Sequence, residues 1–270
     1  MKFFDRDNEI SELRKIREMS RESARFTVLT GRRRVGKTEL IKQAYLDEPF
    51  IYFYVSRKTQ VNLCEEFKEI AAKALGRDIP GRIERFSEIF RFICEEAIAR
   101  PITLVIDEFQ DFVKIDESIF SEIARDWDAF HVRAKLNLVV SGSINRLMSQ
   151  IFEDREAPLY GRNTGRIKLT PFSVPVMKEL LSFYNPSYTN EDLLALWTFT
   201  GGVARYVALL MDAKAVTKAK MIAEIVRPNS SFFDEGKVVL IEEFGKDYAT
   251  YFTILSAISA GKTSRDRIET

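Results

Sequence analysis

The residues best suited to chemistry lie in one short segment, Gly31-Arg-Arg-Arg-Val-Gly-Lys-Thr38, which has the spacing G-x-x-x-x-G-K-T. Gly31 and Gly36 lack a Cβ, so the loop can curl and turn successive backbone N–H groups toward phosphate oxygens. Lys37 offers a positive charge to the β- and γ-phosphates, and Thr38 offers a hydroxyl to Mg²⁺. The spacing therefore predicts that a nucleotide is bound by Gly31, Arg32, Arg33, Arg34, Val35, Gly36, Lys37 and Thr38.

Two adjacent carboxylates, Asp107 and Glu108, follow a continuous apolar run that begins after Pro101. Such a run suits a central parallel strand that is covered on both faces. The carboxyl ends of parallel strands form the edge where open α/β sheets bind ligands. An exposed acidic turn is the simpler alternative. With a phosphate loop upstream, we expect Asp107 to hold Mg²⁺ and Glu108 to act as general base on the attacking water.

Other polar residues could approach the γ-phosphate. Ser141 and Ser143 end the neighbouring apolar strand, and Ser143 is favoured because Ser141 could pack inward. Arg162 precedes the last strand and Arg205 lies near the start of a later helix; either could offset charge in a phosphoryl-transfer transition state. A solvated loop arginine is the commoner case. The three arginines inside the phosphate loop could contact a polyanion, although loop arginines more often face solvent.

The composition bounds the class of protein. The 270 residues are 46% hydrophobic and include 41 basic and 40 acidic side chains, for a net charge of +1. This charge gives no electrostatic footprint for nucleic acid across the whole chain. A single histidine, His131, argues against a histidine metal site or a Ser-His-Asp triad, and Cys64 and Cys94 lack metal-ligand spacing. The apolar runs are too short for a membrane span and no signal peptide is apparent, which predicts a cytoplasmic protein.

Strand and helix patterns alternate through the first part of the chain and predict an α/β fold with a parallel sheet. The expected strands are 25–30, 50–55, the run after Pro101, 136–143 and 166–169, and the expected helices are 10–16, 37–45, 61–75, 85–99, 118–133 and 144–152.

Beyond Pro171 the strand patterns stop and helical periodicity continues over 174–183, 191–198, 203–211 and 215–226. We therefore expect an α/β core over residues 1–171, a small all-helical domain over 172–230, and a final segment, 231–270, with about two helices and the start of a third.

The ordered set of motifs resembles the archaeal-type ATPases among the AAA-like and STAND P-loop NTPases. The resemblance covers residues 3 to 212 and implies an ATP-binding core of five parallel strands with a helical lid. It depends on Phe4-x-Arg6-x-x-Glu9-x-x-x-Leu13, the phosphate loop, Leu104-Val-Ile-Asp-Glu108, Ser141-Gly-Ser143, Pro158-Leu-Tyr-Gly-Arg162 and Gly201-Gly202.

By this resemblance, Arg6 lies beside the adenine and Ser143 fills the first sensor position. Arg162 falls where related ATPases keep a finger arginine, and Arg205 where they keep the lid sensor. One departure is Ala204, which stands where the family usually has a proline. Relatives continue into a winged helix-turn-helix. Residues 251–264 resemble its first helix and turn, so we expect the chain to stop inside that module.

Taken together, these features favour a Mg-dependent ATPase that hydrolyses ATP to ADP and phosphate to drive a conformational change. The alternatives are a nucleotide-gated switch with little hydrolysis and a DNA-associated adaptor, against which the near-neutral charge argues. The expected partners are ATP and ADP, a protein partner or a second copy of the chain, and DNA if the C-terminal module is complete. No membrane partner is expected.

Overall fold

The computed structural model describes residues 3–143, 145–232, 235–262, 264–265 and 268. The chain divides into two compact units. One contains the chain up to Phe172 together with Val203–Arg205, and the other contains Ser173–Gly202 and the chain from Tyr206 onward.

The first unit is built on a five-stranded sheet whose strands are all parallel, in the order β2-β3-β4-β1-β5. This sheet confirms the predicted α/β fold. It also places β4 between β1 and β3, so that the carboxyl ends of these three strands are neighbours. The strands are β1 (Arg25–Gly31), β2 (Ile51–Tyr54), β3 (Ile102–Asp107), β4 (Leu136–Gly142) and β5 (Gly165–Leu169).

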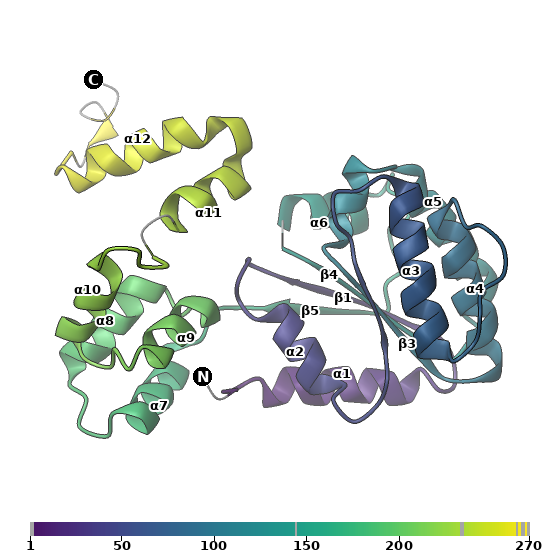
Figure 1. Cartoon of the computed structure of the whole chain (residues 1–270), viewed down its shortest axis with the longest axis horizontal. Helices are drawn as coiled ribbons and strands as arrows, with labels where there is room; N and C mark the ends of the chain where they lie inside the picture. Colours follow the sequence, from purple (N-terminus) through teal and green to yellow (C-terminus); the bar gives the residue numbers. More distant parts are fainter. Residues whose placement is uncertain (1–2, 144, 233–234, 263, 266–267, 269–270) are drawn as a thin grey trace. The chain divides into compact units, whose positions relative to one another are not determined.

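Helices cover both faces of this sheet (Figure 1). Side chains alternate between the two faces of a strand, so Leu104 and Ile106 pack with one set of helices and Val105 with the other. Burial on both faces explains why β3 reads as an uninterrupted apolar run. One face carries α1 (Asp7–Met19) and α2 (Lys37–Ala44), and the other carries α3 (Gln60–Leu75), α4 (Phe86–Ala99), α5 (Ser118–Phe130) and α6 (Asn145–Phe152).

The boundaries differ from the expected ones mainly at element ends. The helix expected at 118–133 ends at Phe130, and Ile144, where another was expected to begin, lies outside the described residues. A short 3₁₀ helix, η1 (Phe109–Lys114), follows the acidic pair and was not expected. It turns the chain sharply just beyond the end of β3.

The second unit is helical in its described part, in agreement with the helical periodicity beyond Pro171. A capping box begins α8, where Thr189 and Asp192 bond each other's backbone N–H groups. Asp192 also accepts a hydrogen bond from the N–H of Lys218 at 2.7 Å, which ties α8 to α10. The helices are α7 (Val174–Tyr184), α8 (Asn190–Thr200), α9 (Ala204–Asp212, whose first two residues belong to the first unit), α10 (Lys218–Val226), α11 (Glu235–Phe244), η2 (Gly245–Asp247) and α12 (Tyr248–Ser259).

The expected start of another helix at 265–270 includes residues 266, 267, 269 and 270, which lie outside the described residues. No helix in the described part of the chain combines the length and hydrophobicity needed to cross a lipid bilayer.

Gly31 ends β1 at a place with no room for a side chain. A Cβ there would lie 2.5 Å from the backbone oxygen of Leu169 on the paired strand β5. Gly31→Ala is therefore expected to lower the free energy of unfolding by about 1–3 kcal/mol, as overpacking typically does. Urea denaturation measures the change. Gly165→Ala in β5 is the control, because its Cβ would meet atoms only at 3.6 Å or beyond; equal losses in both variants would contradict the prediction.

Candidate functional site

The predicted phosphate loop connects β1 to the first turn of α2, as its sequence indicated. Gly36 precedes the helix with φ 101°, a left-handed conformation that favours glycine. Arg34 also has a positive φ, 66°. The side chains of Arg32 and Arg33 are exposed, whereas Val35 is buried. The backbone therefore presents the start of α2, with its unpaired N–H groups and positive dipole end, at the edge of the sheet.

Lys37 is buried inside this loop. Its Nζ donates hydrogen bonds to the carbonyl oxygens of Gly31 at 2.9 Å and Arg32 at 3.4 Å. Burial lowers the pKa of Lys37, and the negative charges of Glu108 and Asp107 partly offset this effect. The ammonium group is thus held within the loop, close enough to Asp107 and Glu108 for their negative charges to raise its pKa.

Asp107 lies at the end of β3 with both carboxylate oxygens fixed by hydrogen bonds. Its Oδ2 accepts from the hydroxyl of Thr38 at 2.9 Å and from that of Tyr52 at 2.6 Å. Its Oδ1 accepts from the backbone N–H of Glu108 at 3.0 Å. The residues predicted to hold a cation, Thr38 and Asp107, are therefore in direct contact although 69 positions separate them.

This donor set fits Mg²⁺. The hydroxyl proton of Thr38 points to Asp107, which leaves the oxygen lone pairs available to a hard cation. Mg²⁺ is usually bound by one or two protein oxygens together with phosphates and waters, rather than by a cage of side chains. The described residues contain no cluster of three or more His, Cys, Asp or Glu suited to a metal ion.

Glu108 adopts a left-handed backbone conformation with φ 55°, which is unusual for a residue other than glycine. Its Oε2 accepts hydrogen bonds from the hydroxyl of Ser143 at 3.0 Å and the amide of Gln110 at 2.5 Å. The central position of β4 brings Ser143 to Glu108. Ser141 is fully buried and its hydroxyl has no hydrogen-bond partner among the described residues. The structure thus places Ser143, rather than Ser141, beside the acid.

Sequence reasoning missed two of these contacts. Tyr52 lies in a strand rich in aromatic residues, so its ring was expected to be buried. No signal in the sequence showed that its hydroxyl bonds Asp107. Gln110 is 1% exposed in the unexpected 3₁₀ helix. A polar residue two positions after the acidic pair was the one available signal.

Arg6 is buried and anchors the start of the chain to the end of β5. One of its guanidinium nitrogens donates to the carbonyl oxygen of Thr170 at 2.6 Å, and another forms an ion pair with Glu9 at 3.2 Å. Its guanidinium also lies over the ring of Phe172, 4.9 Å from the centroid. Because Gly31 pairs with the residue before Thr170, Arg6 lies at the same edge of the sheet as the phosphate loop.

The remaining two predicted arginines have other contacts. Arg162 forms an ion pair with Asp128 at 2.7 Å and donates to the carbonyl oxygen of Pro158 at 2.5 Å. The carboxylate of Asp128 raises the pKa of Arg162. The side chain of Arg205 is exposed, and its backbone N–H donates to the carbonyl oxygen of Arg34 at 3.1 Å.

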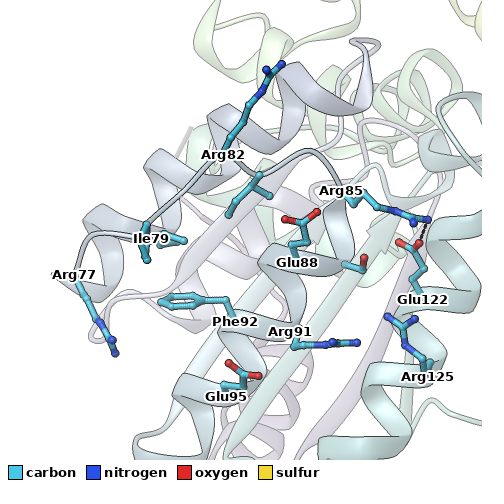
Figure 2. Close-up of a pocket in the computed structure, with 13 residues that line it drawn as sticks. Arg77, Ile79, Arg82, Arg85, Glu88, Arg91, Phe92, Glu95, Glu122 and Arg125 are labelled. Carbon is cyan, nitrogen blue, oxygen red and sulfur yellow. Dashed lines mark hydrogen bonds and ion pairs between the residues drawn. The ribbon is translucent and has the colours of Figure 1, made fainter.

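A separate hollow of about 500 Å³ lies beside α4 and α5. Figure 2 shows Arg85 reaching the carboxylate of Glu122 across it. Arg91 forms an ion pair with the buried Asp126 at 2.7 Å. Carboxylates already neutralise these arginines, so the hollow is less suited to a polyphosphate than the loop before α2.

The comparisons with known proteins agree with this geometry. The family described as an ATPase domain predominantly from Archaea matches residues 3–210. The chain is 27% identical over 267 residues to the uncharacterized protein MJECL04 of Methanocaldococcus jannaschii, a match that covers 99% of this chain and 56% of that protein. The chain thus spans about half the length of this relative.

Two solved structures share the fold. The Walker-type ATPase PABY2304 of Pyrococcus abyssi has a TM-score of 0.65 at 21% identity, over 98% of this chain and 82% of that one. The ORC2 protein of Aeropyrum pernix, solved as ADPNP and ADP complexes, has a TM-score of 0.58 at 14% identity, over 95% of this chain and 73% of that one. The family match, the parallel sheet and the phosphate loop lead to one conclusion: this chain belongs to the family of P-loop ATPase domains found predominantly in archaea.

Proposed function

We propose that the protein binds ATP with Mg²⁺ and hydrolyses it to ADP and phosphate, and that this cycle drives a conformational change. The observation that carries the proposal is the contact between two distant motifs: Thr38 of the phosphate loop bonds Asp107 at 2.9 Å. Glu108, the next residue, is held by Ser143 at 3.0 Å. Family membership and a nucleotide-bound structure of the same fold support the same conclusion.

Each residue has a defined part in this proposal. Lys37 and the N–H groups of the phosphate loop bind the β- and γ-phosphates. Thr38 and Asp107 hold Mg²⁺, which neutralises phosphate charge when bound. Glu108 orients the attacking water and accepts its proton as the water oxygen bonds to the γ-phosphorus and the bond to ADP breaks. Ser143 and Gln110 fix the carboxylate for that task.

The proposal is tested by measuring ATP binding and phosphate release with Mg²⁺ and with EDTA. We expect tight binding and steady turnover that require Mg²⁺. Nucleotide binding with negligible turnover would favour the alternative of a nucleotide-gated switch. The second alternative, a DNA-associated adaptor, requires DNA binding by this chain that weakens steeply with salt.

We also propose that Arg162 acts on the nucleotide of a second copy of the chain, because in its own chain its hydrogen bonds go to Asp128 and Pro158. Specific ATPase activity should then rise with protein concentration, and Arg162→Ala should lower it by about 10-fold or more at high concentration. Arg166→Ala is the control, since Arg166 is an exposed residue of β5 paired with Glu153. A concentration-independent activity that survives Arg162→Ala would contradict the proposal.

Three assignments remain predictions within this proposal. Arg6 contacts the adenine, Arg205 senses the nucleotide from the lid, and the helices over 172–230 form that lid. Residues 231–270 begin a winged helix-turn-helix, through which DNA or a protein partner could be engaged. A cytoplasmic location accords with a nucleotide-driven protein.

A further inference from the structure

Tyr52 hydrogen-bonds the side chain of Asp107 but belongs neither to the phosphate loop nor to the acidic pair. It lies in β2, the strand next to β3, and is paired in register with Val105. Its hydroxyl reaches diagonally across to Oδ2 of Asp107 at 2.6 Å. The tyrosine hydroxyl donates this hydrogen bond and the carboxylate oxygen accepts it.

The ring of Tyr52 is fixed on its other side. It packs edge-on against Phe50 with centroids 6.3 Å apart, and Phe50 contacts Tyr45 at 5.9 Å. These three rings line a broad groove of about 960 Å³ beside α2 and α3. The ring of Tyr52 therefore packs against aromatic side chains, while its hydroxyl points to Asp107.

Tyr52 and Thr38 share the same oxygen of Asp107. A hydrogen bond from Tyr52 keeps this carboxylate in one orientation, independent of how Thr38 meets a cation.

We infer that Tyr52 is a positioning residue for the metal site, orienting Asp107 so that it and Thr38 bind the Mg²⁺ that accompanies ATP. This inference rests on the proposed function. It predicts a specific defect on loss of the hydroxyl: ATP alone should bind as before, while the contribution of Mg²⁺ should weaken.

The test compares Tyr52→Phe with the unaltered chain. The affinity for a fluorescent ATP analogue is measured in EDTA and in increasing Mg²⁺, without reference to turnover. We expect equal affinity in EDTA, a gain on adding Mg²⁺ that is about 3–10-fold smaller, and a correspondingly higher half-saturating Mg²⁺ concentration. In turnover assays, the kcat at saturating Mg²⁺ should change little, whereas a general loss of structure would lower affinity and kcat together.

Tyr54→Phe is the matched control. It removes a hydroxyl from the same strand, and this side chain is 49% exposed. A second comparison combines Tyr52→Phe with Asp107→Asn, in which the carboxylate is already absent. There the loss of the Tyr52 hydroxyl should have no further effect on the Mg²⁺ response.

Two results would overturn the inference, and they differ. In the first, Tyr52→Phe gains as much affinity on adding Mg²⁺ as the unaltered chain, or Tyr52→Phe still reduces that gain when Asp107 is already Asn. Tyr52 then does not act through Asp107, and the proposed function stands. If the unaltered chain itself binds ATP no better with Mg²⁺, both the inference and the Mg-dependent function fail.

Discussion

Glu108→Gln is expected to lower ATP turnover by about 10²–10⁴-fold, the usual contribution of a general base. The amide keeps the size of the side chain and an oxygen that can accept from Ser143, but it cannot take a proton from water. ATP binding should therefore persist. Single-turnover phosphate release, with affinity measured separately, distinguishes the two steps.

Glu95→Gln is the matched control for this variant, because Glu95 is an exposed residue of α4. Turnover that persists in Glu108→Gln at a similar rate would show that another group activates the water. Equal losses of binding and turnover would instead indicate a damaged site.

Lys37→Met is expected to weaken ATP binding by about 10–100-fold. A hydrogen bond to a charged group is worth about 1.5–3 kcal/mol, and each 1.4 kcal/mol is tenfold in affinity. Met keeps the length of the side chain without its charge. Lys42→Met, at an exposed position of the same helix α2, should leave the affinity unchanged. Titration calorimetry with Mg-ATP measures both variants.

The unaltered chain and Lys37→Met should also differ in how their free energy of unfolding depends on pH. Burial lowers the pKa of Lys37 from its ordinary value of 10.5, so the unfolded chain holds this proton more tightly than the folded one. Stability contributed by this group therefore rises with pH between the lowered pKa and 10.5. Denaturant unfolding across this range should show the unaltered chain gaining stability relative to Lys37→Met. A constant difference would argue against a lowered pKa.

The sequence was most informative where local rules act alone. The spacing of the two glycines before Lys37 indicates a phosphate loop, because few other local structures require glycines at these two positions. The apolar run before Asp107 indicates a strand buried on both faces. Parallel strands bring their carboxyl ends to one edge, so the meeting of Thr38 with Asp107 followed from the fold class without a structure.

Contacts that depend on strand order and backbone detail were less accessible. Nothing in the local pattern shows that Tyr52 reaches Asp107, because the contact depends on which strand lies beside β3. The left-handed conformation of Glu108 arises where β3 meets a 3₁₀ turn. The ion pair of Arg162 with Asp128 joins residues 34 positions apart; resemblance could suggest a role for Arg162 but not its partner.

The place of β4 in the middle of the sheet also bears on biosynthesis. A growing chain that has emerged only as far as residue 135 has no β4, and hence lacks the strand that lies between β1 and β3. The loop and the acids cannot take their final spacing until β4 enters between them. A nascent chain therefore cannot bring Thr38, Asp107, Glu108 and Ser143 together until the serine at position 143 has left the ribosome.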